Sequence, residues 1–502
     1  MVAQIIAFAV NLAISFLLTP FIVEHIGKEA YGFVGLALNF VAYAQLVTVA
    51  LNSMAGRYIT ISIHQNDITS ANKYFSSVFY ANLVISFVLT IVFSVVIVYL
   101  NSLLNIPEKL NSDVKLLFSL LFLNFIISMV TSIFGLAYFA KNRLDLSAVI
   151  SIISNILKVI VLLICFAFFT PNVWYIGLAT VLTTLYMFVA NFRLTKKLIP
   201  DIKIKKDNID IEKIIELLKS GMWNTIGRLS VILSSGLDLL IANLFINSAA
   251  MGILSLAKII PTLILSVFAM LAGVYAPNLT SAYALNNYED IKQQLLSSMR
   301  FLGFLSSIPI AVLFAYGDVF FKLWIPGEDY FLIHIISIFT CIELCFALPQ
   351  EGLWNVFTVT NKVKAASINL FIMSFFTISS VFLAMKIVDT SNRIYYLGGI
   401  TSLFSAIRLL TFLPIYGAKC INLKWTTFYP VLFRNFISIL LLTMLSLVMK
   451  LIINPNSWFL LIVIVLITSS LGFVMNNFLI LNKKERKYIF DNTVLKIMKI
   501  KS

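Results

Sequence analysis

Residues 75–100 read FSSVFYANLVISFVLTIVFSVVIVYL, a long run without a charged side chain. A helix needs about 20 apolar residues to cross the hydrocarbon core of a bilayer. Thirteen further apolar stretches of similar length lie between Met1 and Leu481, joined by short polar turns. Fourteen spans use nearly all of the 502 residues and leave little for a soluble domain. The sequence therefore predicts an all-α polytopic membrane protein.

The fourteen predicted spans have boundaries that hold to within a few residues. They are residues 2–23, 31–53, 75–100, 114–140, 146–169, 173–192, 219–246, 250–276, 298–320, 331–357, 366–388, 394–417, 431–452 and 458–481. The first span lacks the basic n-region and small-residue cleavage site of a signal peptide, so we read it as a membrane helix.

The composition and the charge distribution agree with this reading. Hydrophobic residues make up 60% of the chain and charged residues 12%, whereas a soluble domain is about a quarter charged. The net charge of +15 does not indicate nucleic acid, because the basic residues gather in alternate loops. With the N-terminus in the cytoplasm, 26 of the 37 Lys and Arg residues fall in inward segments and 7 in outward ones. The positive-inside rule therefore predicts that both termini are cytoplasmic.

The four cysteines and three histidines give no sign of a disulfide, a metal site or another cofactor. No CxxC motif is present, and the histidines are scattered without ligand spacing. We expect the cysteines to act as small buried hydrophobic residues. They are Cys165, Cys341, Cys345 and Cys420.

The predicted organisation is two six-helix bundles with a cytoplasmic linker. The bundles are residues 1–195 and 219–417, the linker is 196–218, two additional helices occupy 418–482, and a basic tail covers 483–502. A constant shift along the sequence pairs Ala30 with Ala250 and Gly32 with Gly252, and it continues without gaps across two spans. Because the shift contains an even number of spans, both copies enter the membrane in the same direction. The sequence thus predicts a parallel pseudo-two-fold repeat with a site between its copies.

Charged residues inside the spans are the candidates for function. Each costs about 2.5–3.5 kcal/mol at the centre of a membrane helix, so it normally faces protein or water. Serine and threonine residues at helical spacing accompany several of them, which favours a shared wet interior. Structural pairing and snorkelling to the interface, above all for Arg57, are the alternatives. Inside the spans the candidates are Lys158, Arg228, Lys258 and Arg408 for a cationic lumen and Asp238, Glu343 and Glu351 for ion coupling. Arg57, near the cytoplasmic end of the second span, is a further candidate for the lumen.

Prolines inside the spans predict kinks, because proline removes a backbone hydrogen bond. A bend at Pro261 would lie beside Lys258, and such kinks act either as hinges or as static features. The prolines are Pro20, Pro261, Pro309, Pro349 and Pro414.

The segments TPFIVEHIGKEAYGFVGLALNF (19–40) and NSMAGRYIT (52–60) resemble the polysaccharide transporter (Wzx-type flippase) family. That family belongs to the group that includes the multidrug and toxic-compound extruders and the lipid II flippases. The resemblance implies two six-helix bundles, a cationic lumen with alternating access, and transfer of undecaprenyl-pyrophosphate-linked repeat units across the bacterial cytoplasmic membrane. It assigns lumen roles to Arg57, Asp238 and Lys258 by their type and position.

The expected function is therefore a flippase for O-antigen, capsule or exopolysaccharide synthesis, and not an enzyme. The expected partners are the lipid-linked oligosaccharide, the bilayer, and a polysaccharide polymerase with its chain-length regulator. A monomer is expected because one chain supplies both bundles.

Two alternative functions stay open. A cation-coupled multidrug exporter would need an acidic cavity, and a membrane polysaccharide polymerase would need large outer loops, whereas the loops here are short.

Overall fold

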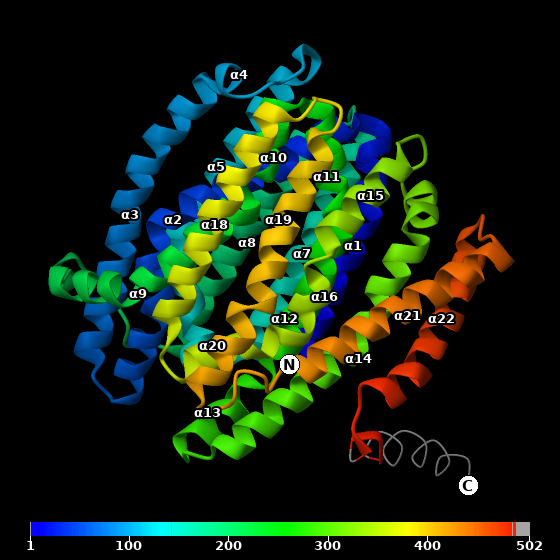
Figure 1. Cartoon of the computed structure of the whole chain (residues 1–502). Coiled ribbons are helices and arrows are strands. Elements are labelled where there is room, and N and C mark those ends of the chain that lie inside the picture. Colours follow the sequence, from blue (N-terminus) through cyan, green and yellow to red (C-terminus); the bar gives the residue numbers. More distant parts are fainter. Residues whose placement is uncertain (1, 142, 484, 488–502) are drawn as a thin grey trace, which may run out of the picture. The chain divides into compact units, whose positions relative to one another are not determined.

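The computed structural model describes residues 2–141, 143–483 and 485–487, which form helices joined by short turns, with no strand among them (Figure 1). Twelve of these helices are long and apolar enough to cross a membrane. The pair Tyr330–Cys341 and Leu344–Val359, bent by 43°, is a thirteenth candidate. A 25-residue helix, α1 (Val2–Ile26), stands where the first span was predicted. The prediction of an all-α membrane protein with about fourteen spans is confirmed, and most of the predicted tail lies outside the described residues.

The chain divides into two compact units, Met1–Ser255 and Leu256–Ser502. The first unit contains α1, α2 (Lys28–His64), α3 (Ile68–Val98), α4 (Leu100–Leu103), η1 (Glu108–Leu110), α5 (Asn111–Thr131), η2 (Ser132–Gly135), α6 (Leu136–Ala140), α7 (Leu144–Phe168), α8 (Trp174–Leu198), η3 (Lys206–Asn208), α9 (Ile211–Val231), η4 (Ile232–Gly236), α10 (Asp238–Phe245) and most of α11 (Ser248–Ala257). Many of these helices continue past the predicted spans, because a span marks only the length that hydrocarbon covers.

The unit boundary differs from the predicted linker at 196–218, since α9 and α10 pack within the first unit. The reason is the close antiparallel packing of α9 against α2. Residues later in α9 contact residues earlier in α2: Tyr58 bonds Ser220 at 2.9 Å and Asn224 bonds Ser53 at 3.2 Å. The same order continues into the turn η4, where Tyr43 bonds Gly236 at 2.7 Å. The predicted domain limits themselves stay a prediction.

The second unit is built around α14 (Tyr288–Trp324), whose apolar stretch is 61% buried, more than that of any other candidate span. This helix contacts α15 (Tyr330–Cys341), α16 (Leu344–Gln350), α21 (Tyr429–Ile453) and α22 (Trp458–Leu479). A buried amide, Asn476 of α22, donates to Ser307 and to the carbonyl of Phe304, and it accepts from Ser438 of α21. This polar cluster attaches the two additional C-terminal helices to α14, and α21 and α22 lie side by side (Figure 1).

The remaining elements of the second unit follow the same pattern of long helices with short breaks. They are α12 (Ile259–Gly273), α13 (Ala276–Ala284), α14 (Tyr288–Trp324), α15 (Tyr330–Cys341), α16 (Leu344–Gln350), η5 (Glu351–Leu353), α17 (Trp354–Val359), α18 (Val363–Ile387), α19 (Arg393–Leu410), α20 (Phe412–Cys420), α21 (Tyr429–Ile453) and α22 (Trp458–Leu479).

Helix ends reproduce the predicted repeat to the residue. The shift that pairs Ala30 with Ala250 also relates the start of α2 to that of α11, and the start of α3 to that of α14. The turn before α3 and the turn before α14 each contain an asparagine with positive φ, Asn66 at 57° and Asn286 at 54°. After these spans the shift is shorter by a single position, as the starts of α5 and α15, α7 and α18, and α8 and α19 show. The local structure is therefore duplicated along the chain.

The close approach of α2 and α11 depends on glycine. A Cβ placed on Gly252 would lie 2.5 Å from the carbonyl oxygen of Lys28. We expect Gly252→Ala to lower the free energy of unfolding by about 1–3 kcal/mol through overpacking. Gly273→Ala is the matched control, since a Cβ there meets nothing within 4 Å. Thermal unfolding of the purified protein in detergent measures both variants, and equal melting points would contradict the packing argument.

The predicted orientation can be tested with cysteine labelling. The four native cysteines are buried and unpaired, so they give a low background. Lys109 and Lys206 are exposed, in a predicted outward loop and in the predicted cytoplasmic linker. We expect a membrane-impermeant maleimide to label Lys109→Cys in intact cells and Lys206→Cys only after permeabilisation. The reverse pattern would invert the topology.

Candidate functional site

Five of the eight candidate charged residues lie at or within a turn of interruptions in the membrane helices. A π-helical turn, η4, ends two residues before Asp238, which begins α10. Lys258 separates α11 from α12, and Glu343 lies in the break between α15 and α16. Glu351 begins the 3₁₀ turn η5, and Arg408 occupies the last turn of α19. Irregular backbone at membrane depth is typical of helices that line a cavity or a binding site.

Two of these interruptions follow from proline. Pro261 and Pro414 are each the third residue of a helix, α12 and α20, so neither can bond the carbonyl four residues earlier. The helix before each proline ends at that point. Pro20 and Pro309 lie inside the continuous helices α1 and α14, so the predicted kinks do not break these two helices. Pro349 lies inside the short helix α16, just before η5.

Side chains bond carbonyls at and near these interruptions. The hydroxyl of Tyr429 donates to the carbonyl of Leu410, the residue four positions before Pro414, at 2.7 Å. The buried amide of Gln350 donates to the neighbouring carbonyl of Leu409 at 2.9 Å. Without such donors each broken span would expose an unsatisfied carbonyl to the membrane interior. The two hydrogen bonds therefore hold the break after α19 in place.

Asp238 is only 4% exposed, beside the junction of α2 with the π-helical turn. The hydroxyl of Tyr43 donates to the carbonyl of Gly236 at 2.7 Å, and the Asp238 carboxyl interacts electrostatically with this tyrosine. The ring of Tyr43 packs on Phe40, with centroids 5.4 Å apart. A carboxyl group buried beside a helix interruption has the setting of an ion or proton site.

In the second unit the structure brings together Arg408, Glu343 and Glu351. The guanidinium carbon of Arg408 lies 5.3 Å from the ring centroid of Trp354, a cation–π distance. Arg408 also interacts electrostatically with both carboxyl groups. We call these three residues the acidic cluster, because two acids surround one base. The two carboxyl groups therefore offset the positive charge of Arg408.

Lys158 lies on the side of α7 that faces away from the exposed apolar surface. Ile153, Ile156 and Ile160 are 44%, 48% and 47% exposed, whereas Ser154 is 7% exposed. Lys158 is half-buried and shares the face of Ser154 by helical spacing. The polar stripe predicted on this helix is therefore turned toward protein.

Arg57 and Arg228 are exposed and flank the junction of α2 with α9. The amide of Asn224 donates to the hydroxyl of Ser53 across this junction. Arg57 lies one turn after Ser53, and Arg228 lies one turn after Asn224 on the antiparallel helix. The two guanidinium groups therefore leave the junction at opposite ends. Lys258, by contrast, is half-buried.

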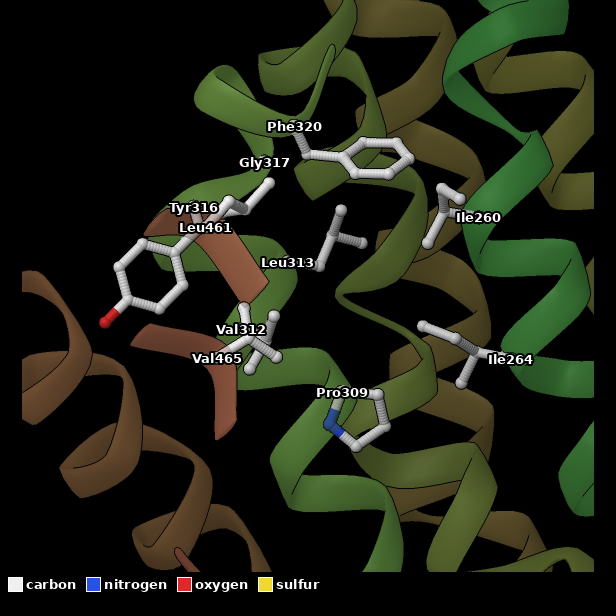
Figure 2. Close-up of a pocket in the computed structure, with 10 residues that line it drawn as sticks. All are labelled: Ile260, Ile264, Pro309, Val312, Leu313, Tyr316, Gly317, Phe320, Leu461 and Val465. Carbon is white, nitrogen blue, oxygen red and sulfur yellow. The ribbon is translucent and has the colours of Figure 1, made fainter. Parts of the chain in front are cut away.

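Figure 2 shows an apolar pocket of about 230 Å³ in the second unit, formed by α12, α14 and α22. Ile260 and Ile264 face Leu313 and Val312 across it, and the Tyr316 hydroxyl points away. Its lining accepts hydrocarbon and offers nothing to a phosphate. It is lined by Ile260, Ile264, Pro309, Val312, Leu313, Tyr316, Gly317, Phe320, Leu461 and Val465.

Sequence reasoning missed a polar network where the linker meets α3. Lys73 forms an ion pair with Asp210 at 3.1 Å, and this pairing holds the pKa of the Asp210 carboxyl below its usual range. The Tyr74 hydroxyl donates to Glu216 at 2.6 Å, and Lys213 bonds the same carboxyl group. The only signal in the sequence is the mixed charge of the linker, which does not name partners so distant along the chain.

The sequence of this chain matches a known protein family. The family model described as "Polysaccharide biosynthesis protein" matches residues 2–283. The chain is 29% identical over 426 residues to the "Uncharacterized membrane protein EpsK" of Bacillus subtilis (strain 168), covering 84% of this chain and 83% of that protein.

Solved transporter structures share the fold at low sequence identity. An inward-facing multidrug resistance MATE family transporter of the MOP superfamily matches with a TM-score of 0.65 and 12% identity, covering 83% of this chain and 94% of that chain. A MOP superfamily transporter from Pyrococcus furiosus Vc1 (DSM3638) matches with a TM-score of 0.60 and 13% identity, covering 84% and 95%. The predicted resemblance is confirmed, and the chain belongs to the polysaccharide biosynthesis protein family, with the fold of MOP superfamily membrane transporters.

Proposed function

We propose that this protein is a flippase that moves undecaprenyl-pyrophosphate-linked oligosaccharide units across the bacterial cytoplasmic membrane for surface polysaccharide synthesis. The family and the fold support a membrane exporter of polysaccharide biosynthesis and favour a transporter over an enzyme. The observation that carries the proposal is the placement of charged side chains at interruptions of the membrane helices in such a protein. An amphiphile with a charged head needs polar groups at membrane depth, and uninterrupted apolar helices do not supply them.

The chemistry of the head group explains the basic residues. A pyrophosphate loses its water when it enters the membrane, and charge-assisted hydrogen bonds from lysine and arginine replace that water. Lys158, Arg228 and Lys258 take this role, together with Arg408 when its carboxylate partners release it. Alternating access then exposes the bound head to each side of the membrane in turn.

The membrane potential favours outward passage of this substrate. One elementary charge changes its energy by about 2.3 kcal/mol per 100 mV. The cell interior is negative, so a doubly negative head group gains roughly twice that amount on moving outward. Positive groups of the carrier that move with the head cancel part of this gain. Asp238, Glu343 and Glu351 take up a proton or Na⁺ for the return step.

A cation-coupled multidrug exporter is the second candidate, and the acidic cluster around Arg408 is the observation that favours it. The Pyrococcus furiosus transporter is described as having a binding pocket of reverse polarity that suggests a different function. The polarity of the pocket is therefore a property by which this fold can distinguish substrates. Among the candidates inside the predicted spans, four are basic and three are acidic, which favours an anionic substrate.

Deletion of the gene separates the two functions. We expect the deletion strain to accumulate lipid-linked repeat units on the cytoplasmic face and to lose surface polysaccharide. Thin-layer chromatography of the lipid extract and staining of the cell surface measure the two effects. Unchanged surface polysaccharide together with altered drug tolerance would establish the exporter instead.

Removal of the Lys258 charge should impair export. We expect Lys258→Ala to lower surface polysaccharide about tenfold or more, because a hydrogen bond to a charged group contributes about 1.5–3 kcal/mol. Lys258→Arg, which keeps the charge, should restore most of the export. Lys109→Ala, in a predicted outer loop, is the control for protein level. Full export by Lys258→Ala at a normal protein level would remove this residue from the mechanism.

Glu351 should matter for ion coupling more than for substrate binding. We expect Glu351→Gln to abolish the response of transport in proteoliposomes to a proton or Na⁺ gradient, because the amide cannot exchange a proton. Binding of the lipid-linked substrate should not weaken, because the amide keeps the size of the side chain and removes a negative charge beside Arg408. An unchanged gradient response would assign Glu351 to the structural pairing with Arg408.

A further inference from the structure

The first unit contains a second pocket, at the end where the linker leaves α8. Its volume is about 450 Å³, within the range of small-molecule sites. It is lined by Phe75, Phe134, Phe192, Thr195, Lys196, Pro200, Ile202, Lys203 and Ile204. None of these residues belongs to the candidate charged residues of the transport function.

The floor of the pocket is aromatic and dry. Phe75 is 1% exposed and Phe134 is 5% exposed. The ring of Phe134 meets Phe75 edge-on at 6.0 Å and Phe192 edge-on at 5.2 Å between centroids. Such a surface accepts hydrocarbon, because it offers π faces and no hydrogen-bond donors.

The rim of the pocket is basic. The ammonium nitrogen of Lys196 lies 4.5 Å from the ring centroid of Phe192, and Lys203 of the linker is exposed and also lines the pocket. Residues 193–207 contain six basic side chains and two acidic ones, Asp201 and Asp207. The rim therefore favours an anion, above a floor that favours hydrocarbon.

The linker wall of the pocket is held before any ligand binds. The backbone N–H of Lys203 donates to the Asn72 side chain at 2.6 Å, and that side chain donates to the carbonyl of Asp201. The Ser76 hydroxyl donates to the carbonyl of Lys203 and accepts from the N–H of Lys205. A preformed wall lowers the ordering cost of binding.

The duplicated fold does not require this pocket. The positions that the repeat pairs with Phe75, Phe134 and Lys196 are occupied by Leu295, Leu353 and Ile415. Leu295 and Leu353 are fully buried in the core of the second unit. At these three positions the first copy thus has aromatic and basic residues, and the second copy has aliphatic ones.

We propose that this pocket binds an anionic phospholipid, with the phosphate between Lys196 and Lys203 and the first part of an acyl chain against the three phenylalanine rings. The pocket lies at the start of α3 and the end of α8, which is the membrane surface for helices of this length. With the predicted orientation this is the cytoplasmic leaflet, whose anionic lipids bind basic pockets between helices. The proposal does not depend on the transported substrate.

Native mass spectrometry of the purified full-length protein tests the proposal. The protein is titrated in detergent with phosphatidylglycerol, with phosphatidylcholine as the neutral comparison and inorganic phosphate as the competitor. We expect phosphatidylglycerol to bind and phosphatidylcholine to bind weakly. A molar excess of phosphate should not displace the bound lipid, because phosphate cannot occupy the aromatic floor.

Two paired variants make the test specific. Lys196→Gln with Lys203→Gln should weaken phosphatidylglycerol binding about 25-fold, at about fivefold per lysine. Lys205→Gln with Lys206→Gln removes the same charge from the same linker outside the pocket and should change binding less than threefold. An equal loss of phosphatidylglycerol binding in both double variants would show that the lipid responds only to the overall charge of the linker. Displacement by phosphate alone would assign the site to a free anion, and either result would overturn the proposal.

Discussion

In a membrane every backbone N–H and carbonyl group must find a partner within the protein, and this constraint governs the whole molecule. Continuous helices meet it by themselves, and they make up most of the described chain. An interruption breaks the pattern and needs a side chain to complete it. Tyr43 does so at Gly236, and Tyr429 and Gln350 do so after α19. Two of the interruptions therefore have built support, and Asp238 and Arg408 lie at or near them.

The sequence predicted the spans and the repeat because both depend on local patterns. Apolar length marks a membrane helix, and the constant shift between the copies carries the turn chemistry with it, so that Asn66 and Asn286 take the same positive φ. The breaks were predictable only in part. Pro261 and Pro414 start new helices, whereas Pro309 sits inside the long α14. The break before Asp238 contains no proline and is a π-helical turn, for which the sequence has no signal.

The candidate residues could be chosen from the sequence, but their contacts could not, and their role in a site stays a prediction. Helical spacing put Lys158 on a polar face, and the exposed isoleucines opposite agree with that. The association of Arg408 with Glu343 and Glu351 joins separate helices, and one sequence does not contain that information. The ion pair of Lys73 with Asp210 could not be predicted for the same reason, because the two residues are far apart along the chain. A charged residue in a membrane span costs free energy, and only the folded structure shows which neighbouring groups offset that cost.

The two copies share their backbone but not their chemistry. The 3₁₀ turns η2 and η5 occupy equivalent places, yet one begins with Ser132 and the other with Glu351. The other charged positions are equally unmatched: the repeat pairs Lys158 with Thr377, Lys258 with Leu38, and Arg408 with Val189. The two copies therefore share their helices and several of their interruptions but differ in where their charges lie. They thus offer different chemical groups, which agrees with the proposed substrate, a molecule with a charged head and an apolar tail.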